Sequence, residues 1–191
     1  MSTRTRRERE RSARERMIVS AARRLAEAEG WDAVTTRRLA AEIEYSQPVL
    51  YSHFAGKDAI MAAVAVEGFA ELATALRAAR TAAAGPRAAL AGVAQAYAAF
   101  ADGRPALYDA MFTQAVDLPF ATPDAPAALR DGFAELRAAL QPLAGADEPE
   151  LLTETFWSAL HGLVGLQRSG RLRRDDHERR LALLVARFGD P

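Results

Sequence analysis

Residues 35–54 read TTRRLAAEIEYSQPVLYSHF, and this stretch decides the fold that we expect. It holds two short segments with apolar residues on one side and hydrogen-bond donors on the other. The first begins at a Thr, which is a competent helix N-cap, and the second begins with Ser46 and Pro48, a favourable helix start. Two such helices a few residues apart are typical of a helix-turn-helix, whose second helix enters the major groove of DNA.

The remainder of the chain also favours helices. Half of its 191 residues are hydrophobic, with Ala dominant, and Ala, Leu, Arg and Glu are strong helix formers. No strand-like alternation runs long enough for a sheet, and Gly and Pro punctuate the helical patterns. The sequence therefore predicts an all-α fold of about nine helices, at roughly 8–29, 36–43, 47–53, 58–83, 86–102, 105–114, 126–143, 149–168 and 176–188.

The first helix carries the core-facing pattern of a small N-terminal domain. Ile18, Ala21, Ala22 and Leu25 follow the i, i+3, i+4, i+7 spacing of one buried helix face. Gly30 follows the last turn, where a left-handed residue is favoured. We expect Leu39, Ile43, Leu50 and Phe54 to complete this core, and we give these residues a structural role only.

The net charge of zero hides an asymmetry. Residues 1–60 hold 12 Lys and Arg against 9 Asp and Glu, and residues 61–191 hold 13 against 16. Seven Arg and three Glu fall within the first 16 residues. This basic N-terminal arm, residues 1–15, has two interpretations: it contacts the DNA backbone or minor groove, or it is a solvated extension of the first helix in which Arg and Glu pair at helical spacing.

The residue types present exclude several functions. The chain has no Cys, which rules out disulfides, thiolate metal sites and Cys nucleophiles. It has no phosphate loop and no hydrolase or metalloprotease motif, and Asp175-Asp176-His177 reads as a solvated loop, so we expect no enzyme, cofactor or metal. Since no apolar run reaches about 18 residues and no secretory signal is recognisable, we expect a cytoplasmic protein without membrane contact.

Gln47 and Arg37 are the candidate base-reading residues. Gln can bind adenine, and Arg can bind guanine, through two hydrogen bonds each. Pro48 and Val49 offer apolar surface to thymine methyl groups, and Tyr51 could donate to phosphate.

His53 and Lys57 are further candidates for phosphate contact. Lys57, the only lysine, precedes the fourth helix. Two readings of it stay open: Asp58 offsets its charge, or Lys57 and the free helix amides face a phosphate.

Residues 16–60 resemble the DNA-binding domain of TetR/AcrR-type transcriptional regulators. By that resemblance Arg37, Gln47, Pro48 and Val49 would contact bases, and the backbone would be held by Thr36, Tyr51, His53 and Lys57. The likeness is carried by these residues: Ile18, Ala21, Ala22, Leu25, Gly30, Thr35, Thr36, Leu39, Ala40, Leu50, Tyr51, His53, Phe54 and Lys57.

Three positions depart from the family pattern. Glu44 stands where Gly is usual in the turn between the two helices, and it places negative charge near DNA. A non-Gly residue is unfavourable at positive φ, so the sequence leaves the shape of this turn open. Pro48 and Val49 replace a common Gly and a common Thr.

Residues 61–191 resemble a C-terminal regulatory domain type named for its Trp-His-Gly residues, here Trp157 and His161-Gly162. The resemblance implies a homodimer through the last two helices and a pocket for a small hydrophobic inducer. The alternative for each apolar residue here is an ordinary place in the core. The candidate pocket residues are Tyr97, Phe100, Tyr108, Met111, Phe112, Trp157 and His161.

The sequence therefore predicts a helix-turn-helix head, residues 16–60, and a larger ligand-binding and dimerisation domain, residues 61–191. We expect a ligand-responsive transcriptional regulator, a repressor by the family default, released from a palindromic operator by its inducer. The alternatives of another class are a helical interaction module and an enzyme, and neither of them would bind DNA.

Overall fold

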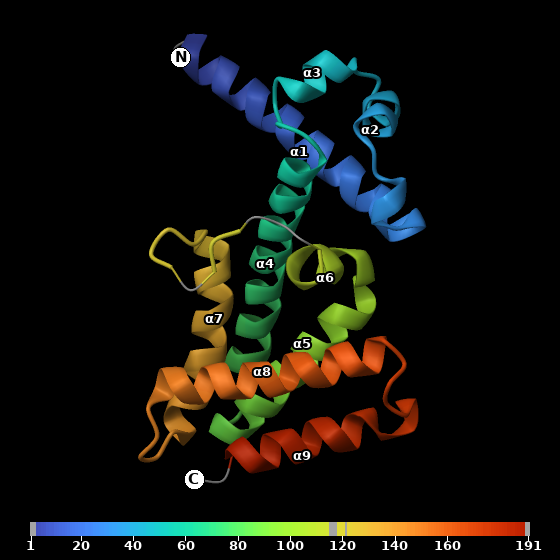
Figure 1. Ribbon diagram of the computed structural model, residues 1–191. Coiled ribbons are helices and arrows are strands. Elements are labelled where there is room, and N and C mark those ends of the chain that lie inside the picture. The colour runs from blue at the N-terminus through green and yellow to red at the C-terminus, as the bar shows by residue number, and fades with distance from the viewer. Residues whose placement is uncertain (1–2, 115–117, 121, 190–191) are drawn as a thin grey trace. The chain divides into compact units, whose positions relative to one another are not determined.

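The structure is a computed structural model that describes residues 3–114, 118–120 and 122–189 (Figure 1). These residues form nine α-helices and three short 3-10 helices, with no strand among them, which confirms the predicted all-α fold. The α-helices are α1 (Thr3–Glu29), α2 (Thr36–Glu42), α3 (Gln47–Tyr51), α4 (Lys57–Thr81), α5 (Pro86–Gly103), α6 (Pro105–Phe112), α7 (Ala127–Leu140), α8 (Pro149–Arg168) and α9 (His177–Gly189).

Some helix ends differ from the prediction. The first helix begins at Thr3 instead of residue 8, because Arg and Glu pairs at i, i+4 spacing continue the helical pattern into the N-terminal arm. The third ends at Tyr51 instead of residue 53. The seventh ends at Leu140, and a 3-10 turn, Gln141–Leu143, follows because Pro142 cannot supply the next backbone donor.

The chain forms two compact units. The N-terminal unit comprises residues 1–68 and 104–122, and the C-terminal unit comprises residues 69–103 and 123–191, within the described residues. The first unit therefore includes α6 and the start of α4 in addition to the predicted head. In contrast to the sequence prediction, one helix of the described residues, α4, is long and apolar enough to cross a membrane by length and composition. Half of its most apolar 18-residue window is buried, as in a core helix.

The core of the N-terminal unit is formed by α1, α2, α3 and the start of α4. Ile18, Leu39, Leu50 and Ile60 are completely buried. The buried stripe on α1 and the core roles of Leu39 and Leu50 agree with the sequence prediction, whereas Ile43 and Phe54 are only partly buried.

Helix α6 is held to α1 by hydrogen bonds at its first turn. The carboxylate of Glu27 accepts from the backbone N–H groups of Ala106 and Leu107, at 3.2 and 3.0 Å. The indole N–H of Trp31 donates to the carbonyl oxygen of Ala106 at 2.7 Å. Because first-turn amides have no partner within their helix, a carboxylate placed there is stabilising.

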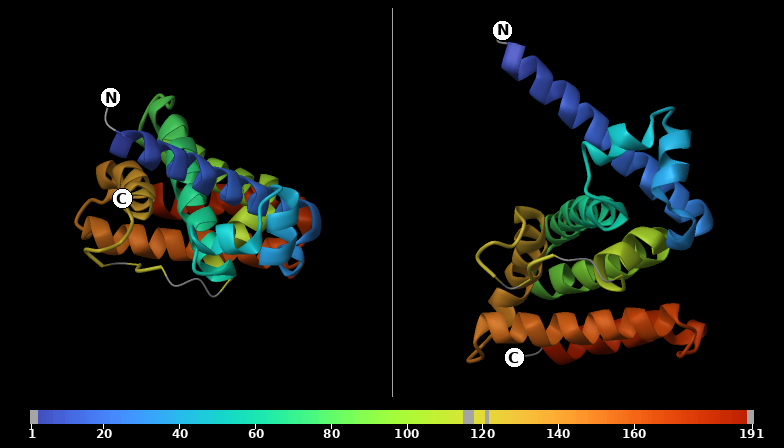
Figure 2. Two further views of the ribbon diagram at one scale, coloured as in Figure 1. Left: turned by 90° about the horizontal axis from the view of Figure 1, so that it is seen from above. Right: turned by 45° about the horizontal axis from the view of Figure 1, so that its top comes forward.

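The C-terminal unit packs α5 against α7 and α9, and α8 against both α7 and α9. Figure 2 shows α8 and α9 running side by side. Tyr97 and Phe156 are completely buried, and the rings of Phe156 and Phe188 meet edge to face at 5.2 Å.

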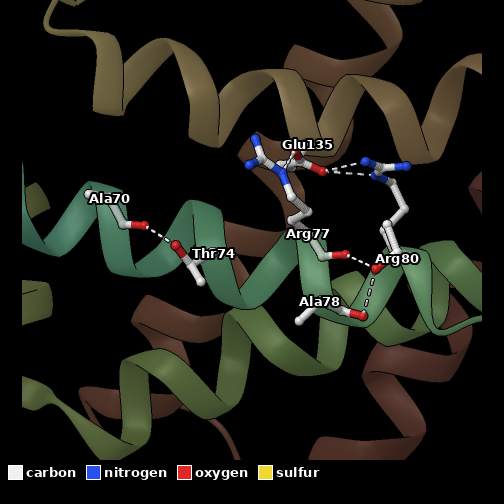
Figure 3. A network of polar contacts seen from close by, with 7 residues as sticks. Ala70, Thr74, Arg77, Ala78, Arg80 and Glu135 are labelled. Carbon is white, nitrogen blue, oxygen red and sulfur yellow. Dashed lines mark hydrogen bonds and ion pairs between the residues drawn. The ribbon is translucent and has the colours of Figure 1, made fainter.

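A carboxylate joins α7 to the C-terminal half of α4 (Figure 3). Glu135 is buried and accepts from the Nε atoms of Arg77 and Arg80, at 2.7 and 2.8 Å. Burial alone would raise the pKa of Glu135, but the bonds from the two guanidinium groups outweigh it and lower the pKa below its ordinary value of 4.5. The carboxylate is therefore ionised, as a partner of two arginines must be.

We expect Glu135→Gln to lower the free energy of unfolding at neutral pH by about 1–3 kcal/mol, because charge-assisted hydrogen bonds are lost. The folded pKa lies below the unfolded one, so this stabilisation is present above about pH 4.5 and is lost as the pH falls through the folded value. Urea unfolding at pH 7 and in acid checks this, with exposed Glu154→Gln as the control. An equal loss at both pH values would contradict the prediction.

Candidate nucleic-acid interface

The two helices of the predicted motif begin directly after the predicted N-cap residues, Thr35 and Ser46. The side-chain oxygen of Thr35 accepts from the backbone N–H of Arg38 at 3.2 Å and caps α2. Ser46 occupies the N-cap position of α3 without a side-chain hydrogen bond, and Pro48 lies in the first turn. These short-range signals explain why both helix starts could be read from the sequence.

The turn between α2 and α3 has the geometry that usually requires Gly. Glu44 has φ of 58°, and it is the only non-Gly residue with positive φ in the described part of the chain. The N–H of Tyr45 donates to the carbonyl of Ala40 at 2.8 Å, and that of Glu44 donates to Ala41 at 3.3 Å. This pair of bonds is the Schellman termination of a helix, so the turn keeps its shape with Glu at the strained position.

We expect Glu44→Gly to raise the free energy of unfolding by about 0.5–1 kcal/mol. A left-handed conformation costs a non-Gly residue about 1–2 kcal/mol, and the greater flexibility of Gly in the unfolded chain offsets part of the gain. Chemical denaturation measures the change.

Glu44→Ala is the matched variant, because it removes the carboxylate and keeps the Cβ atom that causes the strain. If the Ala variant gains as much as the Gly variant, charge and not backbone strain explains the effect.

The predicted base-reading residues lie on the exposed side of α2 and α3. Arg37, Gln47, Pro48 and Val49 are all exposed. Val49 exposes 38% of its surface, an unusual position for an apolar side chain in a well-packed head. The guanidinium, the amide and the apolar groups that direct readout of bases uses are thus all exposed on α2 and α3.

Two hydroxyl groups of this surface lie close together. The Thr36 and Tyr51 oxygens are 3.4 Å apart, although the residues belong to different helices. Tyr51 exposes 52% of its surface. The pair offers two donors to one acceptor, which suits the phosphate contact predicted for both.

Neighbouring Arg38 has a different role that sequence reasoning missed. Its guanidinium forms two hydrogen bonds with the carboxylate of Glu29, one of them at 2.7 Å, and this ties α2 to the end of α1. Arg24 and Glu42 form a second link between the same helices, at 3.4 Å. The partners are 9 and 18 residues apart, so no helical spacing indicates them.

His53 and Lys57 face inward in this structure. The His53 side chain is only 7% exposed, and its Nδ1 atom lies 3.5 Å from a carboxylate oxygen of Glu15 on α1. The Lys57 ammonium donates to the carbonyl oxygen of Trp31 at 2.6 Å. Neither reading of Lys57 from the sequence foresaw this bond, and phosphate contact by either residue stays a prediction.

Three predicted pocket residues meet in the C-terminal unit. The Trp157 indole N–H donates to the Tyr97 hydroxyl at 3.2 Å, and that oxygen lies 3.1 Å from Nδ1 of His161. Burial lowers the pKa of His161, so its ring is neutral at pH 7. Phe100 is buried on the same helix as Tyr97.

The other three belong to the N-terminal unit, on α6. The rings of Tyr108 and Phe112 are 4.8 Å apart. Met111 packs on Gly68 so closely that a Cβ atom there would lie 2.6 Å from its sulfur.

A groove of about 850 Å³ lies elsewhere, between α5 and α9, and none of the seven predicted pocket residues lines it. Its walls combine apolar residues with charged and polar ones. The lining residues are Arg87, Ala88, Ala91, Gln95, Glu178, Arg179, Leu181, Ala182, Val185 and Ala186.

An all-α chain with an exposed helix-turn-helix surface defines a DNA-binding transcription regulator, and two family models agree. The model of bacterial regulatory proteins of the tetR family matches residues 18–64. The model of tetracyclin repressor-like C-terminal domains matches residues 90–188, which is more than half of the chain. The protein belongs to the tetR family of regulators.

Solved structures share this fold. The candidate regulatory protein SCO4313 is 24% identical with a TM-score of 0.74, over 95% of this chain and 97% of that one. The TetR-family regulator PfmR of Thermus thermophilus is 21% identical with a TM-score of 0.63, over 88% and 97%. RolR, solved in complex with resorcinol, is 16% identical with a TM-score of 0.69, over 96% and 91%. Curated protein sequences give no match.

Proposed function

We propose that this protein is a homodimeric repressor that binds a palindromic operator and is released from it by a small hydrophobic molecule. The observation that carries the DNA-binding part is the exposure of Arg37, Gln47 and Val49 on one helix-turn-helix surface. Arg37 and Gln47 have no hydrogen-bond partner among the described residues, so their donors and acceptors are available to base edges. Thr36 and Tyr51 would hold a phosphate beside them.

A dimer is proposed because one short recognition helix reads only a few base pairs. Two helices related by a twofold axis read a palindrome, and specific binding then exceeds non-specific binding by about 10³–10⁷. Exposed leucines on the last two α-helices support this arrangement: Leu151 and Leu166 on α8 expose 63% and 44%, and Leu183 on α9 exposes 58%. We propose that they pack against the second copy.

Replacing Gln47 with Ala is expected to relax base preference at one position of each operator half-site, at a cost of about 1–3 kcal/mol for the preferred base. Selection from a randomised duplex pool finds the preferred sequence, and titration of single-base variants measures the loss. Gln114→Ala, at an exposed Gln of the N-terminal unit, is the matched control. If the wild-type protein shows no preference for any DNA sequence, the proposal is wrong.

Ligand response is proposed to pass through Trp31. The indole of Trp31 binds the first turn of α6, which carries Tyr108, Met111 and Phe112, and its carbonyl oxygen holds Lys57 at the start of α4. A molecule that moves α6 would therefore disturb the position of Lys57. Such a molecule weakens DNA binding only through its different affinities for the two arrangements.

We expect an inducing molecule to weaken operator binding by about 5–150-fold, the usual range of allosteric coupling. Resorcinol, the molecule found in RolR, is the first probe of a panel of small phenols and aliphatic acids. With an active molecule in hand, Trp31→Phe should reduce the coupling, because it removes the indole N–H and keeps an aromatic ring.

Operator binding of this variant without ligand serves as the internal control. If no molecule of the panel changes operator affinity, the induction part fails while DNA binding stands. If Trp31→Phe leaves the coupling unchanged, the route through Trp31 is wrong.

We further propose that the protein works in the cytoplasm, without enzymatic activity and without a cofactor. These proposals follow from the class of protein, since regulators of this family act on DNA by binding. If the same titrations show no binding to any duplex, the protein is instead a helical interaction module that does not bind DNA.

A further inference from the structure

The N-terminal half of α1 continues the buried face of the helix as a stripe of arginines. Ile18, Ala21 and Leu25 are buried, and their spacing repeats toward the N-terminus as Arg14, Arg11 and Arg7. Positions 7, 11, 14, 18, 21 and 25 alternate steps of four and three, so they share one face of the helix. We call Arg7, Arg11 and Arg14 the arginine stripe.

This part of α1 has solvent around it. Every residue from 6 to 14 is exposed, and Figure 1 shows α1 running on past α3 toward its N-terminus. The His53–Glu15 contact places the end of the stripe directly beside the segment that follows α3. The stripe therefore begins where the recognition helix is anchored and extends away from it on the same face of α1.

Two arginines of the stripe have no acidic partner in the described part of the chain and can pair with an anion. Arg11 pairs with Glu15 at 2.8 Å, but Arg7 and Arg14 have no ion-pair or hydrogen-bond partner within the described residues. On other faces of the arm, Arg6 pairs with Glu10, and Arg16 donates to Ser12 at 2.7 Å. Arg7 and Arg14 therefore present unpaired positive charge on the stripe face, whereas the charge of Arg6 on another face is neutralised by Glu10.

From this arrangement we infer that the arginine stripe is an additional binding surface for the phosphate backbone of DNA, used by α1 as a helix and without reading bases. The inference rests on the proposed DNA-binding function and extends the interface beyond the helix-turn-helix. Arg7 and Arg14 are two helical turns apart, about 10 Å at 1.5 Å per residue, so they reach different phosphates of one strand. Arginine binds phosphate oxygens through two parallel N–H groups.

Phosphate binding by the stripe would also stabilise the N-terminal part of α1, which has few other stabilising contacts. A helix of about 12 residues without packing is marginal in water, and each surface Arg–Glu pair adds only about 0.3–0.5 kcal/mol. The first turn has no acidic residue, so its positive helix end also lacks compensation. Phosphates along the stripe would supply that negative charge, and DNA binding would increase the helix content of the arm.

The test is a salt titration with a 40-base-pair duplex of mixed sequence, because phosphate contacts need no operator. We expect the double variant Arg7→Ala, Arg14→Ala to reduce the slope of log K against log salt by about 2, one for each lost contact. Alanine keeps helix propensity at these exposed positions, and circular dichroism verifies the fold.

The matched control is the double variant Arg9→Ala, Arg16→Ala, which removes the same charge from the opposite face of the arm. It should keep the wild-type slope to within about half a unit. Equal slopes for the two variants would overturn the stripe in favour of a general charge effect, and an unchanged slope for Arg7→Ala, Arg14→Ala would overturn any role of the arm. Both results leave the proposed operator binding intact, whereas a wild-type chain that binds no duplex refutes both proposals.

Discussion

Trp31 joins three parts of the N-terminal unit. Its ring donates to the carbonyl of Ala106 in α6, and its own carbonyl accepts from Lys57 at the start of α4. One residue thus connects the end of α1 with two helices that are distant in sequence. With Glu27 bonded to the same turn of α6, the connection combines a buried aromatic ring with charge-assisted hydrogen bonds, which are stronger than neutral ones.

The turn of the helix-turn-helix contains one strained residue, Glu44. The backbone at Glu44 is left-handed because the Schellman bonds of Tyr45 and Glu44 close the end of α2, and these bonds require that conformation whatever the side chain. Two links from α2 to α1, Arg38–Glu29 and Arg24–Glu42, keep the helix in place on the other side. The position of α2 is therefore set by its contacts with α1, and the turn that leads to α3 is set by the local bonds at the end of α2.

What could be predicted from the sequence depended on short-range signals. Thr35, Ser46 and Pro48 fix the starts of α2 and α3 within a few residues, and the spacing of Ile18, Ala21 and Leu25 identifies the buried face of α1. The bonds of Lys57 and Arg38 could not be foreseen, because their partners are set by packing between helices. The periodicity of apolar residues also could not show whether Tyr97, Trp157 and His161 line a pocket or belong to the core. In the structure their polar atoms form hydrogen bonds with one another.

Lys57 also gives the molecule a chemical property. It is the single lysine of the chain, so one ε-amine is present in the whole sequence. That amine is engaged by the Trp31 carbonyl, and an ammonium held in this way reacts slowly with acylating reagents until the contact opens. The rate of amine modification at Lys57, followed by mass spectrometry, therefore reports how often the bond between Lys57 and the Trp31 carbonyl opens, without an engineered residue.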